Sequence, residues 1–153
     1  MLTEFRLKNF KSFQQQASLP LGPLTVLIGA NAAGKSNAIE ALRLLSWLAQ
    51  GNKLGSIQSA VNQGDALIRG RLDDVFRRGE SVFALGAKLS APDGPELTIE
   101  VGRRDGELHI VQERLQAAGK WLYQMERPSA GLSTRVWTVD SDLLGLDHLP
   151  HGT

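Results

Sequence analysis

Gly29-Ala30-Asn31-Ala32-Ala33-Gly34-Lys35-Ser36 is the most informative stretch of the chain, because it fits the pattern G-x-x-x-x-G-K-[S/T] at every fixed position. Its glycines allow the backbone to curl, so that successive N–H groups face phosphate oxygens. Lys35 supplies a positive charge for the β- and γ-phosphates, and Ser36 offers a hydroxyl to Mg²⁺. The stretch predicts a binding site for a nucleoside triphosphate, in the first place ATP with Mg²⁺.

The residues on either side of this loop have the patterns that such a site requires. Leu24 to Ile28 form a short, continuous apolar run with β-branched members, which predicts a fully buried strand. From Lys35 onward the pattern is helical, and Gly51-Asn52 is expected to end the helix. A helix that starts at the lysine turns the positive end of its dipole toward the phosphates. Apolar residues recur along it at three-residue steps: Ile39, Leu42, Leu45 and Leu48.

Alternating patterns elsewhere predict a largely antiparallel sheet, so the expected fold class is α/β. Thr3, Phe5 and Leu7 alternate with charged residues, and Asp105-Gly106 is a strong hairpin signal between residues 97–102 and 107–113. Further strands are expected around residues 15–19, 81–90, 121–125 and 134–139. Short helical turns are expected at residues 65–68 and 72–78.

Composition restricts the remaining possibilities. The 153 residues include no cysteine, which excludes disulfide scaffolds and thiolate chemistry, and the histidines His109, His148 and His151 lack metal-ligand spacing. The net charge of +1 gives no overall basic field for nucleic acid. The N-terminal residues do not form a signal peptide, and no apolar run is long enough for a bilayer, so we expect a cytoplasmic protein with no membrane partner.

The loop alone does not choose among GTPases, kinases and ATPases. Residues 52–55 begin like the N-K-x-D motif that recognises guanine in GTPases, but they lack its aspartate. Residues 142–145 match D-x-x-G, but they follow the N-K pair, which is the wrong order for a GTPase. A small-molecule kinase normally carries the loop on its first strand, whereas here a hairpin's length of chain precedes it. A nucleotide-sensing module without turnover is a further alternative.

Two pieces of sequence around the loop carry a more specific resemblance. They are F-R-L-K-N-F-K-S-F at residues 5–13 and P-L-T-V-L-I-G-A-N-A-A-G-K-S-N-A-I-E-A-L at residues 23–42. Together they resemble the first lobe of ABC-type ATPase heads of the SMC, RecF and OLD-like kind, often labelled AAA family ATPases in bacteria and phages. Residues 69–80 and the strands after them resemble the antiparallel β-subdomain of those heads.

The resemblance implies a domain organisation and additional site residues. Residues 1–153 would form the N-terminal lobe: a strand pair, loop and first helix (1–50), a short helical connection (51–80) and the β-subdomain (81–140). Lys11 and Ser12 would lie near the phosphates or ribose, and Asn37 would lie under the triphosphate. Phe10 and Phe13 are expected in the core rather than against a base. The implied partner is the downstream half of the head or a second copy, joined by ATP, with a role in DNA transactions or anti-phage defence.

Elements that the resembled heads need for hydrolysis are missing from the sequence. It contains no glutamine loop and no L-S-G-G-type signature. Residues 136–140 look like an apolar strand that ends in an aspartate, but Asp140 is followed by Ser141 instead of a catalytic glutamate, so we expect an ordinary strand there. Asp73 and Asp74 are expected to start a helix or to face solvent, not to bind metal. We therefore expect this chain to be the triphosphate-binding part of a longer ATPase.

Overall fold

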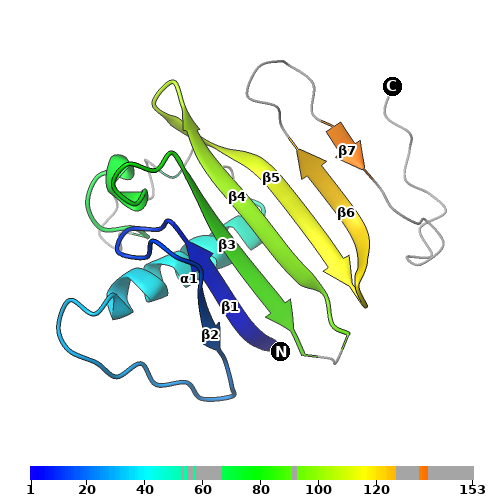
Figure 1. Cartoon of the computed structure of the whole chain (residues 1–153), viewed down its shortest axis with the longest axis horizontal. Helices are drawn as coiled ribbons and strands as arrows, with labels where there is room; N and C mark the ends of the chain where they lie inside the picture. The colour runs from blue at the N-terminus through cyan, green and yellow to red at the C-terminus, as the bar shows by residue number, and fades with distance from the viewer. Residues whose placement is uncertain (53, 55–56, 58–66, 91–92, 127–134, 138–153) are drawn as a thin grey trace.

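A computed structural model describes residues 1–52, 54, 57, 67–90, 93–126 and 135–137 of the chain. In Figure 1 the long helix of the described part lies beside a curved sheet. The elements are β1 (Leu2–Lys8), β2 (Ala17–Pro20), α1 (Lys35–Ala49), the 3₁₀ helix η2 (Leu72–Val75), β3 (Val82–Leu89), β4 (Glu96–Arg104), β5 (Glu107–Ala117), β6 (Lys120–Glu126) and β7 (Arg135–Trp137). Among the described residues, no helix is long and apolar enough to cross a membrane.

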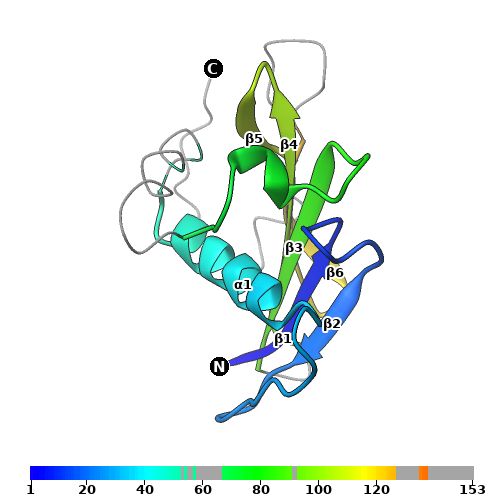
Figure 2. The same cartoon turned by 90° about the vertical axis from the view of Figure 1, so that its left-hand side faces the viewer.

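The strands form a single seven-stranded antiparallel sheet in the order β2-β1-β3-β4-β5-β6-β7. Figure 2 shows that α1 lies across one face of this sheet. The core fills the space between them, because β1 and its neighbours direct alternate apolar side chains toward the helix. The largest buried side chains of this core include Phe5, Phe10, Leu44, Phe83 and Leu85.

Most of the predicted elements are confirmed. In β1 the alternation holds, with Phe5 and Leu7 buried while Arg6, on the opposite face, reaches Glu96. The hairpin turns at Asp105 and Gly106, both of which have positive φ (52° and 82°), and Arg104 pairs with Glu107. Two consecutive left-handed residues are what a type I′ hairpin turn requires, and Asp-Gly is a preferred pair for it, which explains why the sequence located the turn correctly.

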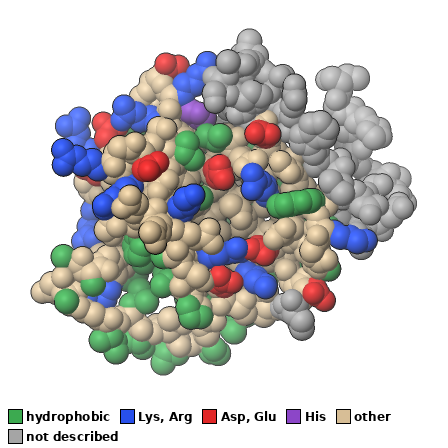
Figure 3. Space-filling model, in the orientation of Figure 1, with side chains coloured by type: hydrophobic (Ala, Val, Ile, Leu, Met, Phe, Trp, Pro, Cys, Tyr) green, Lys and Arg blue, Asp and Glu red, His purple; other side chains and the backbone are tan. Residues whose placement is uncertain are grey.

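The prediction of a buried strand at Leu24–Ile28 is wrong. These residues form no strand, and Leu24, Val26 and Ile28 are 84%, 67% and 90% exposed. Figure 3 shows hydrophobic side chains gathered along the lower part of the molecule, where Figure 1 places the segment between β2 and α1. A continuous apolar strand needs hydrogen-bonding neighbours and cover on both faces, and no described strand pairs with this segment.

Other differences are smaller. In α1, Ile39 is 44% exposed, while the buried stripe consists of Ala38, Glu40, Ala41, Leu44 and Leu45. The helical turn predicted at residues 72–78 is confined to η2. Of the strand predicted at residues 134–139, the structure describes residues 135–137, which form β7. The predictions for residues 65 and 66, Asp140, His148 and His151 also fall outside the described residues. Phe10 is fully buried and Phe13 packs against the core, as predicted.

Candidate functional site

The glycine-rich loop leads directly into α1. Gly34 is the N-cap of the helix and adopts a left-handed conformation with φ of 86°, and Ala32 has φ of 65°. The first helical hydrogen bond runs from the amide of Ala38 to the carbonyl of Gly34 at 2.9 Å. The amides of residues 34–37 therefore have no acceptor within the helix. Such a group of amides at the positive end of a helix dipole can bind an anion.

The Lys35 side chain folds back over the start of the loop. Its Nζ donates to the carbonyl oxygens of Gly29 and Ala30, at 2.6 Å each. Ser36 lies exposed in the first turn of the helix, so its hydroxyl is accessible. The positive charge and the hydroxyl that the motif requires thus lie at the same end of α1 as the amides, which is the arrangement that phosphate and Mg²⁺ need.

The turn of residues 9–13 packs against this end of the helix. The Nδ2 of Asn37 donates to the Oγ of Ser12 at 2.8 Å. Ser12 Oγ also lies 2.9 Å from the position that a Cβ on residue 34 would take, and the Phe13 ring lies 3.3 Å from it. The structure therefore brings together Ser12, Gly34 and Asn37, three of the predicted site residues.

Lys11 has a different environment from the other predicted site residues. Its side chain is 11% exposed, and its Nζ contacts Glu40 and donates to the carbonyl of Arg69 at 2.8 Å. Glu40 also contacts Arg69. Burial raises the pKa of Glu40, but hydrogen bonds from Lys11 and Arg69 and their positive charges outweigh it, so the pKa lies below its ordinary value of 4.5. Glu40 is therefore an anion that holds two cations.

The sequence did not place Glu40 or Arg69 at the nucleotide site. The sequence does contain a signal for Glu40, because it is the one carboxylate among the apolar positions on the buried side of the helix. A buried charge requires a partner, so its position indicates an ion pair. Asp73 and Asp74 lie in the first turn of η2, as predicted: Asp74 accepts from the Arg71 amide at 2.8 Å, and Asp73 contacts Arg103.

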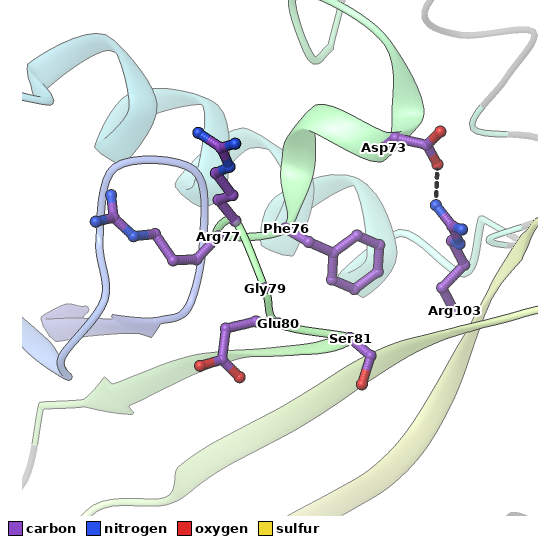
Figure 4. Close-up of a pocket in the computed structure, with 8 residues that line it drawn as sticks. Asp73, Phe76, Arg77, Gly79, Glu80, Ser81 and Arg103 are labelled. Carbon is purple, nitrogen blue, oxygen red and sulfur yellow. Dashed lines mark hydrogen bonds and ion pairs between the residues drawn. The ribbon is translucent and has the colours of Figure 1, made fainter.

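A cavity of about 370 Å³ lies on the side of the 9–13 turn where η2 leads into β3. Figure 4 shows its lining, which contains both arginines and acidic side chains, with Asp73 in contact with Arg103. An arginine of this cavity contacts the turn, since Arg77 Nη1 lies 3.4 Å from the Ser12 carbonyl. The lining includes Phe76, Arg77, Arg78, Glu80 and Ser81.

A change of Gly34 to alanine is expected to reduce the free energy of unfolding by more than the same change at Gly51. Both glycines have positive φ (86° and 81°), so both variants bear the left-handed penalty of about 1–2 kcal/mol. At Gly51 nothing lies within 4 Å of the added Cβ, whereas at Gly34 the Ser12 hydroxyl must turn away from Asn37. We expect an additional loss of about 1 kcal/mol, measured by urea unfolding, and equal losses would contradict this packing.

These elements define a mixed α/β protein with an ATPase-type loop between an antiparallel sheet and its one long helix. A family model described as "AAA ATPase domain" matches residues 1–89, more than half of the 153-residue chain. The chain belongs to this family. The match confirms the family that the sequence pieces at residues 5–13 and 23–42 indicated.

Similarity to individual proteins agrees with this assignment. The DNA replication and repair protein RecF of Picosynechococcus is 38% identical over 117 residues, covering 72% of this chain and 29% of that protein. The RecF protein of Nostoc punctiforme is 29% identical over 111 residues, covering 72% and 25%. That of Cyanothece is 43% identical over 47 residues, covering 31% and 12%. The chain therefore spans less than a third of the length of these relatives.

Proposed function

We propose that residues 29–36 bind ATP together with Mg²⁺. The supporting observation is the position of the complete motif: its lysine is the first residue of the 15-residue helix α1, and the helix amides that lack an intrahelical acceptor begin at Gly34. Backbone N–H groups of the loop would hold the phosphates, Lys35 would contact the β- and γ-phosphates, and Ser36 would supply a hydroxyl ligand to Mg²⁺. The residues of the proposed site are Gly29, Asn31, Ala32, Ala33, Gly34, Lys35, Ser36 and Asn37, flanked by Lys11 and Ser12.

Mg²⁺ suits these residues because it prefers oxygen ligands, and in phosphate-loop sites a Ser or Thr hydroxyl binds it together with phosphate oxygens. The accessible hydroxyl of Ser36 provides one such oxygen next to the loop. When bound, the ion would neutralise part of the phosphate charge, while Lys35 and the helix amides orient the triphosphate.

The nucleotide proposal is tested by titrating the chain with a fluorescent ATP analogue in the presence of Mg²⁺ and then displacing the analogue. We expect ATP to displace it and AMP to fail, because AMP lacks the β- and γ-phosphates that the loop and Lys35 would bind. Chelation of Mg²⁺ should weaken the binding. Equal displacement by ATP and AMP would mean that the site reads the base or ribose rather than the phosphates.

We further propose that the chain is the N-terminal lobe of a longer ATPase head, with the domain division given above, acting in the cytoplasm. The downstream half would then cover the exposed apolar side chains of residues 24–28. An apolar groove of about 430 Å³ between α1 and the sheet offers further surface of the same kind, lined by Leu42, Leu45, Leu97 and Leu115 among others. A second copy joined through ATP is the alternative partner.

The biological role proposed for the whole protein is in DNA transactions, with anti-phage defence as a second possibility. The first is supported by the relatives, which are named as DNA replication and repair proteins. Because the chain spans only 25% and 29% of the lengths of two of them, DNA binding need not be a property of this part alone.

The isolated chain is expected to bind duplex DNA only weakly, with a dissociation constant of about 10⁻⁴–10⁻⁶ M at physiological salt. Tight binding to duplex DNA requires many unpaired cations on one face. Here Arg69 contacts Glu40, and Arg103 contacts Asp73. Figure 4 shows that the surroundings of Arg77 also include the acidic side chain of Glu80. Fluorescence anisotropy with labelled duplex at two salt concentrations measures this affinity.

Reversal of two arginine charges provides the control for the DNA experiment. The alternative is that Arg69, Arg71, Arg77 and Arg78 form a basic stripe that binds DNA. If they do not, Arg77→Glu/Arg78→Glu should change the weak affinity little. Submicromolar binding by the wild-type chain, with a steep salt dependence that this variant abolishes, would instead identify the surface around η2 as a DNA-binding site.

A further inference from the structure

The carboxylate of Glu40 lies in the first half of α1, one turn beyond Ser36. Its side chain is 5% exposed, and the residue as a whole is 4% exposed. It is one of two polar residues that the described part buries this deeply, and the other, Gln112, is uncharged. A carboxylate in such a place is strongly destabilising unless it is paired, so its partners carry information about its role.

Glu40 has two cationic partners from segments that are far apart in sequence. Oε2 contacts Lys11 in the turn of residues 9–13, and Oε1 contacts Arg69 in the segment before η2. The Lys11 ammonium also donates to the Arg69 carbonyl at 2.8 Å, so the three residues form one network. The network joins the helix that follows the loop to two other segments of the chain.

The turn of residues 9–13 has a backbone that needs to be held in place. Asn9 and Lys11 have positive φ of 55° and 48°, which L-residues adopt at an energetic cost. One edge of the turn is fixed by backbone hydrogen bonds, from Lys11 to Val75 and from Arg77 to Asn9, both 2.9 Å. The side toward α1 is fixed by the Lys11 side chain on Glu40.

The residue that follows Lys11 is the one that contacts the loop. Ser12 accepts a hydrogen bond from Asn37 and lies against Gly34, the last glycine of the motif. We propose that Glu40 is a positioning residue of the nucleotide site: through Lys11 it holds the 9–13 turn so that Ser12 closes against Gly34 and Asn37. This inference rests on the proposed function, namely that the loop binds ATP.

Glu40→Gln and Ser12→Ala, alone and combined, test this role through the affinity for a fluorescent ATP analogue with Mg²⁺. Glu40→Gln keeps the shape of the side chain and removes its charge, and we expect about fivefold weaker binding. Because Glu40 would act through Ser12, the double variant should bind no more weakly than Glu40→Gln. Glu107→Gln, at an exposed glutamate at the start of β5, is the matched control and should bind like the wild type.

A purely structural role of Glu40 would give a different result. The two fold-changes would then multiply in the double variant, and that outcome would overturn the inference. If Glu40→Gln does not fold, as judged by circular dichroism, Lys11→Gln replaces it, since Glu40 then keeps Arg69 as a partner. Lys11→Gln should show the same loss and the same lack of additivity with Ser12→Ala.

The failure of this inference is distinguishable from failure of the proposed function. Tight binding by the wild type with unchanged binding by Glu40→Gln and Lys11→Gln would overturn the positioning role and leave the ATP site intact. Absence of binding by the wild-type chain would overturn both.

Discussion

Replacement of Lys35 by alanine is expected to weaken ATP binding about tenfold or more. The ammonium would make charge-assisted contacts with the β- and γ-phosphates, and a hydrogen bond to a charged group contributes about 1.5–3 kcal/mol, which corresponds to at least about a tenfold change in affinity. In the structure the ammonium already lies over the loop, 2.6 Å from the carbonyl oxygens of Gly29 and Ala30. The affinity is measured by titration with a fluorescent ATP analogue.

Two controls make the Lys35 result interpretable. Lys120→Ala removes an exposed lysine at the start of β6, away from the loop, and should leave the affinity unchanged. Circular dichroism and the melting temperature should show that Lys35→Ala remains folded. A folded Lys35→Ala variant that binds ATP as tightly as the wild type would remove the basis for assigning residues 29–36 as the phosphate site.

The isolated chain is expected to bind ATP but to hydrolyse it at least about a hundredfold more slowly than the 1 s⁻¹ that is common for enzymes. The reason lies in the sequence, in which Asp140 is followed by Ser141 instead of a catalytic glutamate and no L-S-G-G-type signature occurs. A general base and the stabilisation of transition-state charge each contribute orders of magnitude to the rate.

A phosphate-release assay on the purified 153-residue chain measures this rate. The Lys35→Ala variant provides the background, because any release that survives the loss of Lys35 does not come from this site. Steady release near about 1 s⁻¹ that depends on Lys35 would show a complete active site within the chain. That outcome would favour a self-contained enzyme, such as a small-molecule kinase, over the lobe of a larger ATPase.

The elements that the sequence predicted correctly are those specified by local chemistry. The alternation in β1 and the Asp105-Gly106 turn each depend on a few neighbouring residues, and both are found where expected. The start of α1 at Lys35 is confirmed for the same reason, since Gly34 adopts the left-handed conformation that lets the chain enter the helix.

The prediction failed where burial depends on distant parts of the chain. An apolar run such as Leu24–Ile28 shows that the segment favours burial, but not what would cover it. In the structure its residues are largely exposed and no described strand pairs with it. In α1, similarly, the three-residue steps favoured Ile39 as a buried position, whereas contacts with Lys11 and Arg69 place Glu40 inside.

The candidate site was predicted unevenly for a related reason. Residues 29–36 follow from a contiguous motif, so no tertiary information was needed to propose them. Glu40, Lys11 and Arg69 meet across separations of 29 residues along the chain, and no local pattern encodes such a meeting. The proximity of Ser12 to Gly34 was implied only by the resemblance to ATPase heads, and the structure supplies its geometry.

If the loop at residues 29–36 holds the phosphates of ATP, the backbone amides of the loop should respond to the nucleotide. The measurement is a titration of the ¹⁵N-labelled chain with ATP and Mg²⁺, followed residue by residue. We expect the largest shifts on the amides of residues 29–37, with Ser12 also affected, and much smaller shifts with AMP. Shifts that are absent, or that gather instead around the Phe76–Ser81 cavity and leave residues 29–37 unchanged, would contradict ATP binding by the loop.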